Sequence, residues 1–401
     1  MASDESLALT KALIKELNKD NKDGKVAWCL ATDKDNPTDV RDFISTGSTL
    51  LDYIICNRRG GGIPVGKITE IVGEEATGKS LLVTQILAET QRRGGLGVYI
   101  DEENALNPEF ATRVGLNLDK LVYMQCGSVE AVGEQIEKVI NLARLKDVKS
   151  LITIVWDSVA ATPPKAELEG DYDPNSRVGL QAKAIAKMMR KLTQTVGRER
   201  VTLIFTNQMK TKIGVVFGDP MGTPGGKAIP YHASVRIRLY RSTELKEESE
   251  SEKNYFGVHT RAKLIKNRQG PPLRTCEFDI HFSDGIQDAE SIRDYLHRVG
   301  EIEKRAGWMY MKGVVVSTEK KDPTTGELTY IDPPLPVGEA KFRSSEFAHM
   351  FRSDRHFRNS IMGILDRRLI VSFDAKEIPD MELDPESFTD NEAVGNIIAD
   401  G

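Results

Sequence analysis

Residues 67–82, KITEIVGEEATGKSLL, constrain the fold more than any other stretch of this chain. An apolar run that favours a β-strand leads into a turn with a glycine near each end, and residues typical of a helix follow. The turn, GEEATGKS, matches the pattern G-x-x-x-x-G-K-[ST]. In such a turn the backbone N–H groups point at phosphate oxygens, and the following helix directs the positive end of its dipole at the same anion. The stretch therefore predicts a nucleotide-binding α/β domain.

The eight residues of this turn are candidate phosphate contacts. Gly73 and Gly78 let the backbone curl tightly. Lys79 places a positive charge at the β- and γ-phosphates, and the Ser80 hydroxyl is a candidate Mg²⁺ ligand. The remaining turn residues, which offer backbone N–H groups, are Glu74, Glu75, Ala76 and Thr77.

Three further runs repeat the strand signal: LGVYID at 96–101, LITIVWD at 151–157 and VTLIFTNQ at 201–208. Runs as apolar as these are typical of strands buried in parallel sheets, and helical stretches separate them. With 401 residues, 39% of them hydrophobic, the chain also has enough apolar side chains for a full core. We therefore expect a mostly parallel α/β core over residues 43–286.

Two of these runs end in acidic residues of the kind that nucleotide hydrolysis requires. The apolar residues before Asp157 would carry its carboxylate to the C-terminal end of a strand beside the turn, where it can hold a Mg²⁺-bound water. The alternative is an aspartate that caps the next helix. Asp101, Glu102 and Glu103 end another strand, and one of them would orient or deprotonate the attacking water. Their spacing does not choose among the three.

Charge and cysteine usage indicate the cellular setting. The net charge of −5 requires that any nucleic acid be bound by a local basic surface. The four cysteines, at 29, 56, 126 and 276, lack the paired spacing of a zinc site and favour free thiols in a reducing cytoplasm. The first 20 residues carry charges throughout, so we expect neither an export signal nor a membrane partner.

Four segments flank or interrupt the core. Leucines four apart predict an amphipathic helix over 6–17, which would pack either on its own domain or on a neighbouring subunit, within an N-terminal segment 1–42. Charged residues 241–254 favour an exposed hairpin or loop. Mixed, proline-interrupted residues 287–373 suggest a small C-terminal domain. Residues 374–401 hold nine carboxylates and one lysine, and we expect a disordered acidic tail that either solvates the protein or occupies a DNA-binding surface.

Taken in order along the chain, these and other motifs resemble the bacterial RecA recombinase family. The strings that carry the resemblance run from about residue 5 to 312 and include ISTGSTLLD, GGGIPVGKITEIVGEEATGKS, YIDEENALNPEFATRVG, IVWDSVAATPPKAELEG, LIFTNQMKTKIGVVFGDP, GGKA and KLIKNR. Several of these strings are specific to the family. The C-terminal region diverges, with an apparent insertion at 313–340, and leaves a bacterial and a viral source both open.

The resemblance implies a role for several further residues. The catalytic glutamate of the family falls on Glu103, and Gln208 matches a polar group that senses the γ-phosphate. Phe110 falls where the family stacks an aromatic ring on adenine, although tyrosine is usual there. Lys266 and Arg268 match two basic residues that reach the γ-phosphate bound by the adjacent subunit, where the second residue is usually lysine.

The resemblance also marks two DNA-binding loops, at 167–179 and 210–228. Without it, the second loop would read as a mobile lid, and the basic helix after the first loop as a solvated face. The residues expected to contact DNA are Arg177, Val178, Gly179, Lys183, Arg190, Lys210, Lys212, Ile213, Phe217, Gly225, Gly226 and Lys227. The basic stretch 341–358 would be either a gateway for duplex DNA or another solvated helix.

The implied activity is that of a DNA-dependent ATPase that uses ATP and Mg²⁺. Such a protein would polymerise with itself into a helical filament on single-stranded DNA, align that strand with homologous double-stranded DNA, and exchange strands in DNA recombination and repair. One alternative is a ring-forming helicase on the same fold. The other is a non-hydrolysing filament or regulatory DNA-binding protein that binds ATP without cleaving it. The helix and linker of segment 1–42 favour a filament, and Glu103 favours hydrolysis.

Overall fold

A computed structural model describes residues 2–19, 25–33, 36, 38, 40–146, 150–169, 179–211, 221–248, 253–321, 328–336 and 339–372. The chain divides into a large unit, Met1–Ile370, and a second unit, Val371–Gly401, of which only residues 371 and 372 are described. The expected acidic tail therefore lies outside the described residues. No helix in the described ranges is long and apolar enough to cross a membrane.

Within the described residues, a nine-stranded sheet forms the centre of the large unit, in the order β13-β12-β11-β10-β3-β7-β6-β4-β5. The six strands from β10 to β5 run parallel, and β11, β12 and β13 add an antiparallel edge. This arrangement confirms the predicted mostly parallel α/β core. The strands are β3 (Ile68–Gly73), β4 (Leu96–Asp101), β5 (Leu121–Met124), β6 (Ile152–Asp157), β7 (Val201–Gln208), β10 (Val235–Glu248), β11 (Lys253–Asn267), β12 (Thr275–His281) and β13 (Gly285–Ile286).

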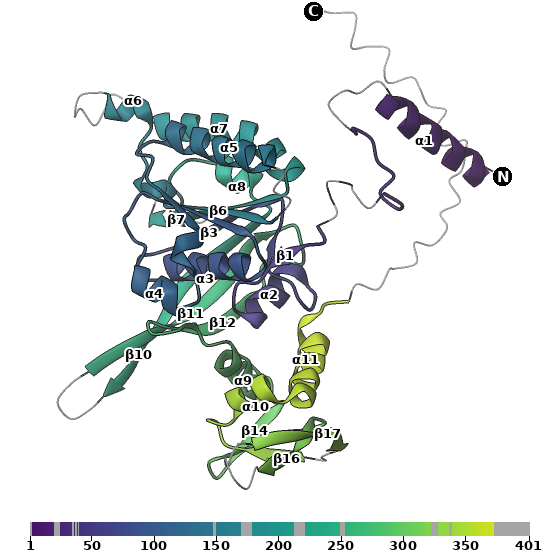
Figure 1. The fold of residues 1–401 in the computed structure, drawn as a ribbon, viewed down its shortest axis with the longest axis vertical. Coiled ribbons are helices and arrows are strands. Elements are labelled where there is room, and N and C mark those ends of the chain that lie inside the picture. The colour runs from purple at the N-terminus through teal and green to yellow at the C-terminus, as the bar shows by residue number, and fades with distance from the viewer. Residues whose placement is uncertain are drawn as a thin grey trace, which may run out of the picture. The chain divides into compact units, whose positions relative to one another are not determined.

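Helices cover both faces of this sheet, as Figure 1 shows. Strand β3 is buried along its whole length because alternate residues enter different cores: Ile68 packs with α5, α7 and α8, whereas Ile71 packs with α2 and α3. The helices are α2 (Thr49–Cys56), α3 (Lys79–Arg92), α4 (Pro108–Arg113), α5 (Val129–Leu145), α6 (Lys165–Leu168), α7 (Leu180–Arg198) and α8 (Ala228–His232), with 3-10 turns at Leu118–Lys120 and Val159–Ala161.

The register of the parallel strands brings the predicted site to one edge of the sheet. Gly73 at the end of β3 lies opposite Gln208 at the end of β7. Asp101 at the end of β4 lies opposite Asp157 at the end of β6. Carboxyl ends of parallel strands are the usual place for a ligand in such sheets.

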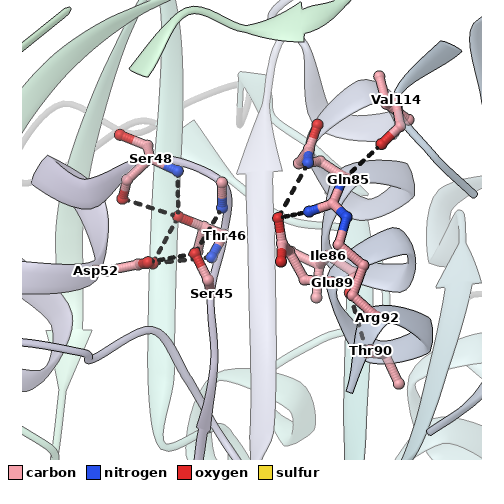
Figure 2. A network of polar contacts seen from close by, with 11 residues as sticks. Ser45, Thr46, Ser48, Asp52, Gln85, Ile86, Glu89, Thr90, Arg92 and Val114 are labelled. Carbon is pink, nitrogen blue, oxygen red and sulfur yellow. Dashed lines mark hydrogen bonds and ion pairs between the residues drawn. The ribbon is translucent and has the colours of Figure 1, made fainter. Parts of the chain in front are cut away.

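Figure 2 shows two polar networks, one at the turn that leads into α2 and one on helix α3. In one, the buried Asp52 carboxylate accepts hydrogen bonds from Ser45 Oγ at 2.6 Å and from Thr46 N and Oγ1 at 2.9 and 2.7 Å. In the other, Glu89 accepts from Arg92, whose guanidinium also donates to the Val114 carbonyl at 2.8 Å. The first network fixes the turn of ISTGSTLLD, and the second ties α3 to the segment after α4.

The C-terminal part of the large unit shares its apolar core with the sheet. Tyr53 and Arg59 both donate to Asp366 at 2.6 Å, which joins α2 and the loop after it to the last helix. The insertion expected at 313–340 contains an antiparallel pair, β16 and β17. The elements of this part are α9 (Asp288–Arg298), β14 (Ile302–Arg305), β15 (Trp308–Lys312), β16 (Val315–Lys321), β17 (Leu328–Pro336), β18 (Glu339–Phe342), α10 (Phe347–Ser353) and α11 (Arg355–Leu369).

Helix α1 (Ala2–Lys19) contains the helix predicted for 6–17. Its leucines at 7, 9, 13 and 17 are 48–61% exposed. The segment predicted as a hairpin or loop at 241–254 joins the antiparallel strands β10 and β11. The remaining short strands are β1 (Phe43–Ile44), β2 (Ile63–Pro64), β8 (Lys210–Thr211) and β9 (Met221–Gly222). The boundaries expected for the N-terminal segment, core, C-terminal domain and tail stay predictions.

Candidate nucleotide and DNA site

The phosphate turn connects β3 to α3, as the sequence predicts. Lys79 begins α3, and its ammonium donates to the carbonyls of Gly73 at 3.2 Å and Glu74 at 2.6 Å. The side chain therefore lies folded over the turn. Burial lowers the pKa of Lys79, while the carboxylates of Asp157 and Glu103 oppose that shift. The position suits a cation that meets phosphate oxygens.

The turn opens into a cavity of about 450 Å³. That volume falls in the range of small-molecule sites. Most of the turn lines it, together with Glu103, Asp157 and Gln208 from three other strand ends. The remaining wall comes from Leu81 of α3 and from the β10–β11 hairpin and the end of β12: Arg241, Glu244, Tyr255, Gly257, Val258 and Phe282.

The three consecutive carboxylates after β4 have different surroundings. Asp101 is buried and accepts hydrogen bonds from the backbone N–H groups of Glu103, Ala105 and Leu106 at 3.0–3.2 Å. Glu102 accepts from the backbone N–H groups of residues 126 and 127. Glu103 is exposed, lines the cavity, and accepts from Ser158 Oγ. Glu103 is therefore the only one of the three whose carboxylate lies in the cavity wall.

Asp157 is 1% exposed and lines the same cavity. Its carboxylate accepts hydrogen bonds from Tyr99 OH at 2.6 Å and from Thr206 Oγ1. Both donors are side chains of neighbouring strands, and no hydrogen bond among the described residues joins this carboxylate to a helix N-terminus. Burial first, and then the charge of Asp157, raise the pKa of Tyr99 well above its ordinary value, so the phenol remains a donor. The alternative of a helix cap is not supported.

Sequence reasoning missed Phe282, an exposed aromatic side chain in the cavity wall. It is 45% exposed, whereas Phe110 is only 7% exposed and does not contribute to the wall. Phe282 continues the alternation of buried Phe278 and Ile280, so the pattern predicts another core residue. The sheet ends there, and the ring is left facing the cavity. The resemblance-based role of Phe110 stays a prediction.

Lys266 and Arg268 lie apart from the cavity, on the other end of β11 and just after it. Lys266 Nζ donates to the carbonyls of Pro230 at 2.7 Å and Tyr231 at 2.9 Å, at the end of α8. Burial lowers the pKa of Lys266, and the neighbouring Arg268 and Arg236 lower it further. Since neither side chain lines the cavity of its own subunit, a role at the nucleotide of an adjacent subunit stays open to them.

The structure describes only part of the two predicted DNA loops. Arg177, Val178, Lys212, Ile213 and Phe217 lie outside the described residues. The candidates with described positions fall into two groups. Lys183 and Arg190 are exposed on α7, just after Gly179, while Gly225, Gly226 and Lys227 follow β9. Of Lys210 only the backbone, at the start of β8, is described.

A second basic surface, which we call the β10–β11 face, was not predicted. Arg236, Arg238 and Tyr240 alternate with buried residues of β10 and so share one face of the strand. Register places basic residues of β11 opposite them, and the guanidiniums of Arg238 and Arg261 lie 4.6 and 4.8 Å from the Tyr240 ring centroid. The opposing residues are Arg261, Lys263 and Lys266. The alternation of basic and apolar residues in RIRLY and RAKLIK could have predicted that these basic side chains share one face of the sheet.

Comparison with known proteins agrees with this geometry. The family model described as the RecA N-terminal domain matches residues 8–287. Protein RecA of Paracoccus denitrificans is 39% identical over 274 residues, which cover 68% of this chain and 73% of that protein. Protein RecA of Trichodesmium erythraeum is 37% identical, with 68% and 71% covered, and that of Bifidobacterium breve is 39% identical, with 70% and 68% covered. The chain therefore belongs to the RecA family.

Proposed function

We propose that this protein is a DNA-dependent ATPase that assembles on single-stranded DNA and exchanges strands with a homologous duplex. One observation carries the proposal: Lys79, Glu103, Asp157 and Gln208 line a single cavity, and the strand that ends in Gln208 leads directly into the predicted DNA loop. A nucleotide bound there touches the strand that precedes the DNA-binding segment. The expected setting is the cytoplasm, beside the nucleoid, or the host cytoplasm for a viral source.

In this proposal Glu103 prepares the attacking water. Its carboxylate is exposed to the cavity and held from one side by Ser158 Oγ. A water between Glu103 and the γ-phosphate would donate a proton to this carboxylate as its oxygen attacks phosphorus. Lys79 would stabilise the negative charge on the phosphate oxygens, and Gln208 would contact the terminal phosphate.

Ser80 and Asp157 would hold Mg²⁺. Both line the cavity, and each oxygen of Asp157 accepts one hydrogen bond, which leaves further lone pairs for a metal-bound water. Magnesium, when bound, neutralises charge on the β- and γ-phosphate oxygens. The donor set of one hydroxyl and one carboxylate suits this ion, which usually keeps several waters.

We place the adenine base against the hairpin side of the cavity. The exposed Phe282 ring can stack on a base there. Phe110, which the resemblance indicates, would have to leave its buried position or meet the base at an edge. Lys266 and Arg268 would complete the site of an adjacent subunit, and the apolar stripe of α1 would dock on a neighbour.

DNA contacts are proposed for three described surfaces. Exposed lysines and arginines of α7, with Lys227, would meet the first strand. The part of the β10–β11 face around Tyr240, where the guanidiniums of Arg238 and Arg261 lie beside the ring, suits a second strand. On the C-terminal sheet, Lys341 and Arg343 lie 4.4 and 4.7 Å from the Trp308 ring centroid, at the start of the predicted gateway for duplex DNA.

A strand-exchange assay tests the proposal. A single strand is incubated with the protein, ATP and Mg²⁺, and a homologous duplex with a fluorophore and quencher on its strands is added. We expect strand transfer that requires ATP and homology and that is lost in Lys79→Ala. A duplex of unrelated sequence is the control. Unwinding of that control duplex at the same rate would instead support a ring-forming helicase.

A further inference from the structure

A buried polar cluster lies behind the phosphate turn, between strands β3, β7 and β10. At its centre is Glu70, which is 0% exposed within the all-buried strand β3. Its carboxylate accepts from Arg236 Nε at 2.5 Å and from Asn207 Nδ2 at 3.2 Å. An apolar side chain would usually serve stability at least as well as a buried carboxylate that needs two donors. Stability alone therefore does not explain why a carboxylate occupies this buried position.

Asn207 uses its whole amide within this cluster. Besides Glu70, its Nδ2 donates to the Pro224 carbonyl at 3.1 Å, and its Oδ1 accepts from the backbone N–H of Gln208 at 3.0 Å. Gln208 is the next residue and lines the nucleotide cavity. One side chain thus connects the end of the sensing strand to the segment that follows β9.

The glycines of segment 224–227 pack closely against α7. A Cβ added to Gly225 would lie 2.7 Å from Ile185 Cδ1, and one added to Gly226 would lie 2.9 Å from Ala182 Cβ. Both glycines have positive φ, at +85° and +73°, a backbone conformation that favours glycine. The segment is held between α7 and Asn207, and it ends in the exposed Lys227.

We propose that Asn207, held in place by Glu70, is a positioning residue that couples the nucleotide cavity to segment 224–227. A shift of Gln208 toward a terminal phosphate moves its neighbour Asn207, and the hydrogen bond to Pro224 passes that shift to the DNA-facing residues. Glu70 keeps the Asn207 amide oriented so that the second N–H points at Pro224. The inference rests on the proposed roles of Gln208 and of the second DNA loop.

A reciprocal exchange of side chains separates coupling from stability. Asn207→Asp alone places two carboxylates together in the core and should destabilise the fold. Adding Glu70→Gln restores a donor and an acceptor, because the new amide at position 70 can donate to the new carboxylate at position 207 and accept from Arg236. The donor to Pro224 stays lost in the double variant. Thr202→Val is the matched control, since Thr202 is buried in β7 and its hydroxyl has no hydrogen-bond partner among the described residues.

The measurements are the melting temperature, the KM for ATP, and hydrolysis with and without single-stranded DNA. We expect the double variant to melt within about 3 °C of the wild type and to keep its KM within about twofold. Its stimulation by DNA should fall about fivefold or more, because a coupling contact is lost. Thr202→Val should keep the wild-type stimulation.

Wild-type stimulation in the double variant would overturn the inference. If the double variant does not fold, Asn207→Ala replaces it, because Glu70 then keeps Arg236 while the tie to Pro224 is removed. Retained stimulation in that variant would overturn the inference equally. Failure of the wild type itself to respond to DNA would instead contradict the proposed function.

Discussion

Glu103 and its two acidic neighbours are consecutive in sequence, yet the fold gives them different partners. The carboxylates of Asp101 and Glu102 accept hydrogen bonds from backbone N–H groups, and both therefore stabilise loops. Glu103 accepts from the Ser158 hydroxyl and faces the cavity. The role of each carboxylate depends on where it lies, since a general base must reach the water that attacks the phosphate.

Exposure distinguishes the two candidate rings for adenine, since Phe282 is exposed and Phe110 is buried. Phe282→Ala should raise the dissociation constant for ATP about 5- to 150-fold, because a stacked base loses on the order of 1–3 kcal/mol. Phe110→Ala should instead lower the free energy of unfolding by about 3 kcal/mol, since that ring is buried. Titration with a fluorescent ATP analogue and chemical denaturation measure the two effects. Unchanged affinity of Phe282→Ala for the nucleotide would mean that adenine does not stack on Phe282, and Phe110 would then be the candidate ring.

Helices and strands were the part of the molecule most open to prediction. The turn of β3 and α3, the buried strands β6 and β7, and helix α1 carry local signals, because apolar period and turn residues act over a few positions. Glu70 and Phe282 could not be assigned in the same way. Glu70 meets Arg236 across 166 residues, and Phe282 meets the cavity through the pairing of an antiparallel edge. Such contacts depend on strand order, which sequence pattern does not give.

Two buried aspartates, Asp52 of α2 and Asp288 of α9, make the free energy of unfolding depend on pH. Burial raises the pKa of Asp52 to about 7, although hydrogen bonds from Ser45 and Thr46 oppose it, and burial raises that of Asp288 to about 6. An aspartate with a raised native pKa binds its proton more tightly in the folded state than in the unfolded chain. Its contribution to the free energy of unfolding is therefore complete below about pH 4 and is lost as pH rises to 7. Asp52→Asn removes the part of this dependence that comes from Asp52. As pH rises from 5 to 8, the free energy of unfolding of the variant should increase by a few kcal/mol relative to that of the wild type.

Chemical denaturation of both proteins at pH 5, 6, 7 and 8 measures this change. The difference between variant and wild type isolates Asp52, because the other titrating groups are common to both proteins. Thr49→Val, which removes a hydroxyl partner of Asp288, provides a comparison at the neighbouring carboxylate. A stability difference that stays constant across these pH values would contradict a raised pKa at Asp52.

The whole molecule offers surfaces that a single subunit leaves uncovered. Helix α1 exposes four leucines, and Lys266 and Arg268 lie away from the cavity of their own chain. Exposed apolar stripes of this kind indicate a protein interface. Both features fit a nucleotide site that is completed when subunits stack, as the proposed filament requires.

Replacing two of these leucines tests the docking role of α1. Leu9→Asp with Leu13→Asp should prevent long filaments on single-stranded DNA, because each leucine loses about 1.5–3 kcal/mol of burial at the interface. ATP binding by the isolated subunit should change little. Lys11→Glu, on the exposed helix between them, is the matched control and should keep filament growth. Electron microscopy measures filament length, and long filaments from the leucine variant would mean that α1 packs on its own domain.

In the proposed mechanism Glu103 is the base for ATP hydrolysis, and DNA controls the rate of that hydrolysis. The direct measurement is the rate of ATP hydrolysis, with and without single-stranded DNA, for the wild type, Glu103→Gln and Glu102→Gln, alongside nucleotide binding. We expect DNA to stimulate the wild type and Glu102→Gln, whereas Glu103→Gln should bind ATP yet hydrolyse it about 10²- to 10⁴-fold more slowly. Hydrolysis by Glu103→Gln at a rate near that of the wild type would rule out Glu103 as the base, and a wild type indifferent to DNA would rule out the control by DNA.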